Sequence, residues 1–346
     1  MPDQGYYRFP TIRGDTIVFV SEDDLWTVPV SGGLARRLTS GQGEASHAQL
    51  SPDGRWLAFT GREEGHTEAY VMPAQGGEIR RLTYLGAVSV VAGWSRDGKS
   101  VVLASNAAAP FLGMIRLFEV PRDGGEPRKL PYGVARWISY GPGKASVIGR
   151  HGADPARWKR YRGGLAGDLW IDVTGKGRYE RLIRLPGNLS SPLWIGSRIF
   201  FLSDHEGVGN LYSCTPTGWD LRRHTHHADF YARNPSSDKD RIVYHAGADL
   251  FLFDMKTGKT GRISIDYRSP RVQRARRFVP AQRFLEDASL NPKGDALAVV
   301  TRGRAYTLGG WDGAAVQHGP EGGARVRLAR WLNDGRRLVA VTDEPG

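Results

Sequence analysis

The stretch Asp24-Leu25-Trp26-Thr27-Val28-Pro29-Val30-Ser31-Gly32-Gly33, continuing to Arg36-Arg37-Leu38-Thr39, decides the fold of this chain. It combines an apolar, aromatic strand with a Gly-Gly turn and a second strand that begins with basic residues. Copies of it place aromatic residues at positions 26, 70, 118, 170, 212 and 251, at intervals of 44, 48, 52, 42 and 39 residues. A period of about 40–50 residues built from short strands predicts a β-propeller with one sheet per repeat.

Each repeat is expected to form four consecutive strands, A to D, and the first repeat runs from Tyr6 to Thr39. Ser51-Pro52-Asp53-Gly54 and Ser95-Arg96-Asp97-Gly98 have the composition of tight turns between strands A and B. Six such units fit between Tyr6 and Tyr267. We therefore expect an all-β fold, a six-bladed β-propeller with four-stranded antiparallel blades over residues 6–267.

The order of the strands, which runs from A to D in every repeat, predicts how the ring closes. Many propellers complete one blade with strands from both ends of the chain, whereas here the first and the sixth units each supply all four of their own strands. We therefore expect no strand exchange at closure, with side-chain packing as the only contact between the two chain ends.

The strand pattern lapses from Arg268 to Arg283, where arginines crowd between Pro270 and Pro280. Residues 268–283 are therefore expected to be a basic linker, with a nucleic-acid clamp as the less favoured alternative. The pattern restarts over residues 284–346 with one blade-like unit and the first two strands of another. Because half a blade cannot bury its own faces, we expect an incomplete second propeller that continues beyond this chain.

Composition narrows the class of protein. The 346 residues carry a formal net charge of +12, which would suit an acidic partner or nucleic acid, but arginines on edge strands also prevent edge-to-edge aggregation. No aromatic stacking surface accompanies the charge, so we expect no nucleic-acid partner. The sequence shows no long apolar run and no apolar signal core, and the lone Cys214 cannot form an internal disulfide. These features favour a cytoplasmic protein without membrane contact.

The longest loops are expected on one face of the disc. In a four-stranded blade the A–B and C–D turns share one face, and the B–C and D–A loops share the other. Long loops over residues 61–67, 106–113, 151–167 and 204–209 belong to the second face. Long loops on a rigid scaffold usually carry binding sites, so we expect this face to meet cargo or the rest of the protein, unless the loops only cover the blades.

The sequence carries no recognisable catalytic motif. It lacks the Gly-x-Ser-x-Gly of α/β-hydrolases and any phosphate-binding glycine loop. His224, His226 and His227 with Asp229 could suggest a metal, but only two imidazoles would share a strand face, so a hydrogen-bonded loop is the preferred interpretation. Asp204-His205-Glu206-Gly207 has the composition of a turn. We expect no catalytic residue, no metal and no cofactor in this chain.

Four runs resemble the N-terminal six-bladed propeller of tricorn-type proteases, and the resemblance spans most of residues 6–346. They are Asp23-Asp24-Leu25-Trp26, Trp158-Lys159-Arg160-Tyr161-Arg162-Gly163-Gly164, residues 203–213 and residues 221–225. The resemblance implies that residues 284–346 begin a seven-bladed propeller. It also implies a cytoplasmic, homohexameric serine peptidase that shortens peptides released by the proteasome, with its catalytic residues and a PDZ-like domain outside this chain.

On that resemblance the chain would be an inactive channel, filter and scaffold, and its partners would be peptides and the remaining domains of the protease. Six loop residues are the candidate positions that face peptides or partners: Trp158, Arg160, Tyr161, Arg162, His205 and Glu206. The family's basic pair that anchors peptide carboxyl ends is missing, since residues 85–93 contain no Arg or Lys. A stand-alone TolB-like propeller that binds proteins is the alternative function, and the lid of a prolyl-oligopeptidase-type enzyme is a third.

Overall fold

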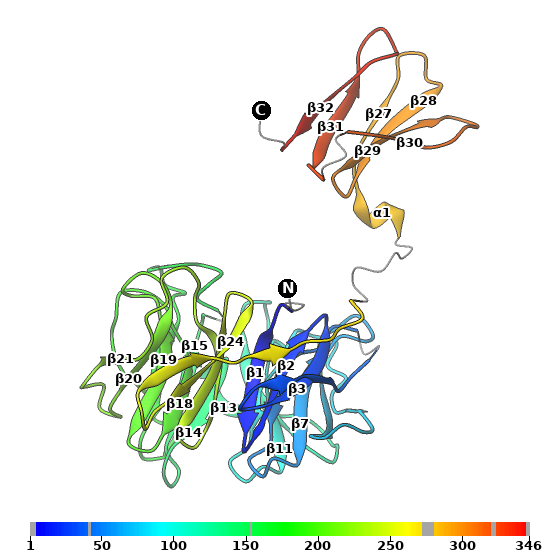
Figure 1. Cartoon of the computed structure of the whole chain (residues 1–346). Helices are drawn as coiled ribbons and strands as arrows, with labels where there is room; N and C mark the ends of the chain where they lie inside the picture. Colours follow the sequence, from blue (N-terminus) through cyan, green and yellow to red (C-terminus); the bar gives the residue numbers. More distant parts are fainter. Residues whose placement is uncertain (1–4, 41–42, 153, 272–279, 320–322, 344–346) are drawn as a thin grey trace. The chain divides into compact units, whose positions relative to one another are not determined.

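The computed structural model describes residues 5–40, 43–152, 154–271, 280–319 and 323–343. The chain divides into two compact units, Met1–Gln273 and Arg274–Gly346. Figure 1 colours the first unit from blue to yellow and the second from orange to red, and both consist of sheets joined by turns and loops.

The first unit is a ring of six four-stranded antiparallel sheets whose innermost strands contact one another in turn. In chain order the sheets are β1 (Arg8–Arg13), β2 (Thr16–Ser21), β3 (Asp24–Pro29) and β5 (Arg36–Arg37); β6 (Ser46–Leu50), β7 (Trp56–Gly61), β8 (Glu68–Pro73) and β9 (Arg80–Arg81); β10 (Ser89–Trp94), β11 (Ser100–Ser105), β12 (Arg116–Pro121) and β13 (Arg128–Val134); β14 (Trp137–Tyr140), β15 (Ser146–Arg150), β16 (Asp168–Asp172) and β17 (Glu180–Arg181); β18 (Leu189–Ile195), β19 (Arg198–Ser203), β20 (Asn210–Cys214) and β21 (Arg222–Arg223); and β22 (Arg233–Asp238), β23 (Arg241–Ala246), β24 (Asp249–Asp254) and β25 (Lys259–Arg262). This order confirms the expected all-β, six-bladed architecture.

Each blade takes its four strands from one continuous segment of the chain, although the first blade leaves β4 out of its sheet, so no blade strand is exchanged at closure. The expectation that only side chains would meet there is wrong. After the sixth blade the chain runs on as β26 (Ile265–Asp266), which pairs in parallel with β4 (Gly33–Leu34) of the first blade. The Gly33 N–H donates to the Ser264 carbonyl at 2.9 Å, and the Ala35 N–H donates to the Asp266 carbonyl at 3.0 Å. A short backbone ladder therefore fastens the last segment to the first.

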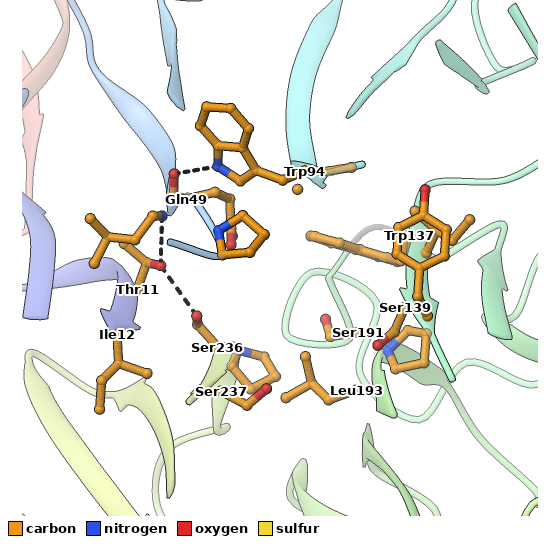
Figure 2. A pocket seen from close by; sticks show the side chains of 18 of the residues that line it. Thr11, Ile12, Gln49, Trp94, Trp137, Ser139, Ser191, Leu193, Ser236 and Ser237 are labelled. Atoms are coloured by element: carbon orange, nitrogen blue, oxygen red, sulfur yellow. Dashed lines mark hydrogen bonds between the residues drawn. The ribbon is translucent and has the colours of Figure 1, made fainter. Parts of the chain in front are cut away.

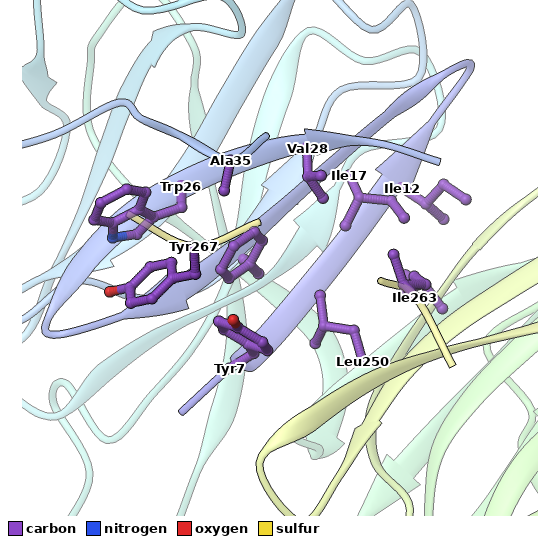
Figure 3. Close-up of a cluster of buried hydrophobic side chains, with 11 residues drawn as sticks. Tyr7, Ile12, Ile17, Trp26, Val28, Ala35, Leu250, Ile263 and Tyr267 are labelled. Atoms are coloured by element: carbon purple, nitrogen blue, oxygen red, sulfur yellow. The ribbon is translucent and has the colours of Figure 1, made fainter. Parts of the chain in front are cut away.

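The same closure buries an apolar cluster formed by both ends of the ring. Figure 3 shows Tyr267, which follows β26, packed between Tyr7 and Trp26 of the first blade. The centroid of the Tyr267 ring lies 5.4 Å from that of Tyr7 and 4.7 Å from that of Trp26. Leu250 and Ile263 of the sixth blade complete the cluster. Burial of these side chains contributes the largest favourable free energy at the seam, since apolar burial is worth about 1.5–3 kcal/mol per large side chain.

The repeated Arg-Leu-Thr element forms a clip between strands C and D. In the first blade the Leu25 N–H donates to Thr39 Oγ1 at 2.9 Å, and that hydroxyl donates to Asp24 Oδ1 at 2.8 Å. Arg37 pairs with the same Asp24 carboxylate. The second blade repeats the clip with Thr83, Glu68 and Arg81. In the fifth blade Thr225 and Asn210 repeat the bonds of the hydroxyl, and Arg223 donates to the Thr225 carbonyl. The clip explains why D strands of only two residues stay attached to their blades.

The second unit contains a four-stranded sheet and a two-stranded sheet. The helix is α1 (Ala281–Phe284), and the strands are β27 (Leu285–Leu290), β28 (Ala296–Thr301), β29 (Arg304–Gly309) and β30 (Val316–His318), followed by β31 (Val326–Trp331) and β32 (Leu338–Thr342). The arginines at 274, 276 and 277 of the expected basic linker lie outside the described residues. Among the described residues, no helix is long and apolar enough to cross a membrane.

Candidate functional site

A cavity of about 410 Å³ lies where the inner strands of all six blades meet. Figure 2 shows its wall, to which every blade contributes at least one side chain. The lining residues include Thr11, Ile12, Gln49, Trp94, Trp137, Ser139, Ser191, Leu193, Ser236 and Ser237. This cavity on the ring axis, called the axial channel below, mixes hydroxyl groups with apolar side chains, and Arg13 and Arg96 also line it. Such a wall can contact both the backbone and the side chains of an extended peptide.

β-Bulges shape the inner strands that line the channel. The pairing of β1, β6, β10, β18 and β22 with their neighbours shifts register, whereas that of β14 does not. Phe9, His47, Ser191 and Asn234 adopt positive φ angles between 47° and 53° at these bulges. A bulge redirects the side chains that follow it, and a positive φ at a non-glycine residue is a strained feature that concentrates at functional sites.

Hydrogen bonds between blades hold the wall of the channel. Thr11 Oγ1 lies 3.2 Å from Ser236 Oγ across the closure and accepts the Leu50 N–H at 3.1 Å. The Trp94 indole N–H donates to the Gln49 carbonyl at 2.9 Å. These bonds join the first blade to the sixth and second blades, and the second blade to the third. The wall is therefore preorganised by the ring itself.

Basic side chains gather where the inner strands begin, near the ring axis on the face that carries the B–C loops; they lie beyond the residues that line the cavity. This region is called the B–C end of the channel. Arg8 begins β1, His47 lies near the start of β6, and Arg233 begins β22. The carboxylate of Asp154, from the insert 151–167 of the fourth blade, accepts hydrogen bonds from Nε and Nη2 of Arg233, with the Nε bond at 2.8 Å. An ion pair therefore joins the fourth and sixth blades at this end.

The imidazoles at this end are neutral at pH 7. Burial lowers the pKa of His47 to about 4, and the positive charges of Arg157 and Arg8 add to that effect while Asp154 opposes it. Burial also lowers the pKa of His245 to about 3, assisted by Arg233 and Arg8. The positive charge of this end therefore resides on guanidinium groups, which stay protonated at every ordinary pH.

The insert brings two of the expected site residues together and holds a third by its backbone. The Trp158 and Tyr161 rings lie 5.1 Å apart, and Trp158 is exposed. The Arg160 N–H donates to Oδ2 of the buried Asp204 at 2.6 Å, and the Asn188 N–H donates to Oδ1 of the same carboxylate at 2.7 Å. Asp204 therefore docks the insert of the fourth blade on the B–C loop of the fifth.

His205 and Glu206 follow Asp204, but their contacts are those of a structured loop. His205 Nδ1 lies 2.9 Å from Ser203 Oγ, and its Nε2 lies 3.9 Å from Glu206 Oε1. Glu206 accepts from the Tyr212 hydroxyl at 2.8 Å and from Arg223 at 3.0 Å. The hydrogen bond from Tyr212 is the main cause that lowers the pKa of Glu206, and burial lowers the pKa of His205.

Arg162 lies apart from the other candidates. It lines a separate cavity of about 320 Å³ together with Arg181, Arg184 and the backbone of the glycines at 163, 164, 167 and 187. The structure thus places Trp158, Tyr161, the backbone of Arg160, His205 and Glu206 along one pair of contacting loops, and Arg162 beside it. All six remain candidates for contact with peptides or partners.

Two histidines of the sequence 224–229 contact neighbouring side chains individually. His224 Nε2 lies 2.7 Å from Ser213 Oγ, and His227 Nε2 lies 2.9 Å from the Tyr244 hydroxyl. Within the part of the chain that the structure describes, no three His, Cys, Asp or Glu side chains gather as metal ligands. Burial raises the pKa of Cys214 to about 11, so its thiol stays protonated at neutral pH.

Comparison with known proteins identifies relatives over most of the chain. A family model described as the tricorn protease N-terminal beta propeller domain matches residues 4–259. A tricorn protease homolog of Saccharolobus solfataricus is 36% identical over 99% of this chain and 32% of its own length, and a putative tricorn protease homolog 2 of Streptomyces coelicolor is 41% identical over 99% of this chain and 30% of its own. A crystal structure of the tricorn protease aligns with a TM-score of 0.83 and 33% identity, covering 95% of this chain and 32% of that one. The chain thus spans about a third of the length of these relatives.

Proposed function

This chain belongs to the tricorn protease family, and from that premise we propose that it is the non-catalytic propeller portion of a tricorn-like serine peptidase. Its axial channel conducts short peptides, filters out folded chains and supports the remaining domains. The single observation that carries this proposal is the cavity that all six inner strands line, with hydroxyl and apolar side chains interleaved. A folded domain is far larger than a cavity of about 410 Å³, whereas an extended peptide segment fits it.

We also propose where the whole protein acts, how it assembles and where its catalytic residues lie. The complete peptidase is a cytoplasmic homohexamer that degrades peptides downstream of the proteasome, with its nucleophile and base in segments other than this chain. Trp158, Arg160, Tyr161, Arg162, His205 and Glu206 face peptides or the remaining domains, and no cofactor or nucleic acid takes part. The family assignment and the exposed position of Trp158 support this arrangement.

Passage of peptides is tested with a thiol placed in the channel wall. Ser237 lines the cavity, so Ser237→Cys in a Cys214→Ser background gives one reporter cysteine. An extended hexapeptide should slow the labelling of this cysteine by a small maleimide, whereas a folded domain of similar charge should leave the rate unchanged. In the same preparation, hydrolysis of a fluorogenic peptide should not exceed the buffer rate. Labelling that no peptide slows would refute the channel, and hydrolysis by the purified chain would refute the non-catalytic role.

A further inference from the structure

The channel end that faces the B–C loops carries more guanidinium groups than carboxylates. Arg8 and Arg233 come from inner strands, Arg157 from the insert, and Arg136 from the residue before β14. Burial, and to a smaller extent the positive charge of Arg157, lower the pKa of Arg136. Arg8 pairs with Asp23 at 3.6 Å and Arg233 pairs with Asp154, whereas among the described residues neither Arg136 nor Arg157 forms an ion pair with a carboxylate. The local potential therefore attracts anions and repels cations.

Asp154 is the carboxylate that the insert places among these arginines. Its Oδ2 accepts both hydrogen bonds from Arg233, and its Oδ1 accepts the Ala156 N–H at 3.0 Å. The ion pair links an insert of the fourth blade to the inner strand of the sixth, so it skips the fifth blade. The pair is called the latch below.

Buried polar groups near the latch lack hydrogen-bond partners. His245 is 1% exposed, and neither of its ring nitrogens has a hydrogen-bond partner among the described residues. Arg8 Nε and Asn234 Oδ1, also buried, lack partners within the same part of the chain. Unpaired buried polar groups cost free energy, so the closed arrangement is less stable than its ion pair alone would suggest.

We propose that the latch makes the channel selective for acidic peptides: a glutamate or aspartate side chain displaces Asp154 from Arg233 and is held by the surrounding arginines, whereas basic peptides are excluded. This inference rests on the proposed function, because it names the class of peptide that the channel takes.

The exchange is favourable because it conserves the strong interactions. An incoming carboxylate replaces the Asp154 carboxylate on Arg233. Arg233 therefore loses its charge-assisted hydrogen bonds to Asp154 and forms equivalent ones to the peptide. The released Asp154 returns to water, where its charge is solvated. A lysine side chain offers no such replacement and would bring a further positive charge next to Arg157 and Arg136, at a cost that grows as water is excluded.

The test is calorimetric titration of the whole chain with blocked hexapeptides. Three peptides, acetylated and amidated so that neither end is charged, alternate glycine with glutamate, glutamine or lysine. The glutamate peptide should bind at least about tenfold more tightly than the glutamine peptide, and the lysine peptide should show no binding. Asp154→Asn removes the internal competitor and should tighten the glutamate peptide further by about tenfold, while Arg233→Gln should abolish its advantage over glutamine.

Asp220→Asn is the matched control, because it removes one carboxylate from the exposed edge of the fifth blade and changes the net charge by the same amount as Asp154→Asn. It should leave all three affinities unchanged. Equal binding of the glutamate and glutamine peptides, or equal effects of the two Asn variants, would overturn the latch while leaving the channel proposal intact. Binding of none of the three peptides would overturn both.

Discussion

At the scale of single residues, the clip of Thr83 shows how a surface strand depends on a buried charge. Glu68 is fully buried, and its carboxylate is satisfied by the Thr83 hydroxyl at 2.6 Å, the Gly86 N–H at 2.9 Å and the Arg81 guanidinium. The Thr83 hydroxyl also accepts the Ala69 N–H at 2.9 Å. One hydroxyl group therefore satisfies both a buried donor and a buried acceptor.

Removing that hydroxyl should destabilise the propeller strongly. Thr83→Val keeps the side-chain shape but leaves the Ala69 N–H and one Glu68 oxygen unpaired, which should lower the free energy of unfolding by about 2–3 kcal/mol. Thr83→Ser keeps the hydroxyl and should cost less than about 1 kcal/mol, the value of one buried methyl group. Urea denaturation followed by circular dichroism measures both. Equal losses in the two variants would show that the hydroxyl is not the cause.

His245 predicts a specific pH dependence of stability. Its pKa is about 3 in the folded protein, against about 6.5 in the unfolded chain, so the unfolded state binds the proton more readily. The stability linked to this group is complete above pH 6.5 and is lost as the pH falls toward 3. Between pH 7 and pH 5 the loss should be about 2 kcal/mol.

The variant His245→Leu removes both the titrating group and the two unpaired nitrogens. It should be at least as stable as the parent at pH 7, and its stability should fall by about 2 kcal/mol less between pH 7 and pH 5. Thermal unfolding at both pH values gives the comparison. The same slope of stability against pH in parent and variant would mean that His245 has the same pKa in the folded and unfolded protein.

At the scale of elements, the closing segment β26 distinguishes two neighbouring glycines with positive φ, Gly32 just before β4 and Gly33 at its start. Gly32 has a φ of +85°, and a Cβ there would lie 2.3 Å from the Ser264 carbonyl oxygen. Gly33 has a φ of +107°, but a Cβ there would meet nothing within 4 Å. The Ser264 carbonyl is the group that accepts the Gly33 N–H. A side chain at Gly33 would add backbone strain alone, whereas a side chain at Gly32 would add backbone strain and a clash with the closing segment.

Alanine substitutions at the two glycines should differ accordingly. Both should cost the strain of a positive φ, about 1–2 kcal/mol. Gly32→Ala should cost at least about 2 kcal/mol more, because it pushes β26 off β4 and opens the seam around Tyr267. Hydrogen exchange at the Ala35 amide, which donates to Asp266, is the direct readout: it should accelerate in Gly32→Ala and stay slow in Gly33→Ala. Unchanged protection in Gly32→Ala would contradict the role given to β26.

The blades were predictable from sequence because their signals are local. Asp24 and Thr39 are 15 residues apart, and the turns that begin at Ser51 and Ser95 fix the start of each following B strand. The ladder of β26 on β4 was not predictable, since two paired residues on each side leave no periodic pattern. Nor was the latch, because Asp154 and Arg233 are separated by 79 residues and meet only when the ring is closed.

The candidate site was predictable from the sequence only in part. The long loops were predictable because loop composition is a local property, whereas the candidates Trp158 and His205 came from the runs that resemble the family and stay predictions. It could not list the channel wall, because bulges at residues such as Phe9 and Ser191 decide which side chains of an inner strand turn inward. A run of Ser and Thr in inner strands, such as Ser236 and Ser237, was the one available signal.

At the scale of the whole molecule, the two units differ in how much apolar surface they bury. The propeller contains six buried clusters, one of which joins the first and the last blade. Because that cluster closes the ring, the blades should lose their packing together. The second unit has a single buried cluster among its described residues, made of Val300, Ala305, Val326 and Ala329. A core of that size provides little stability for a unit of its own.

We therefore predict two unfolding transitions in urea. The second unit should unfold first with a small m-value, since m scales with the surface exposed, and the propeller should follow in a steeper transition. Trp331 reports the first step, because it is partly buried in β31, whereas Trp311 is 97% exposed and should change little. Trp331→Phe should remove the early change from the fluorescence curve and leave the later one in place. A single transition that coincides by fluorescence and circular dichroism would show instead that the two units stabilise each other, and the apolar surface of the second unit would then have to be buried by more than its own four-residue core.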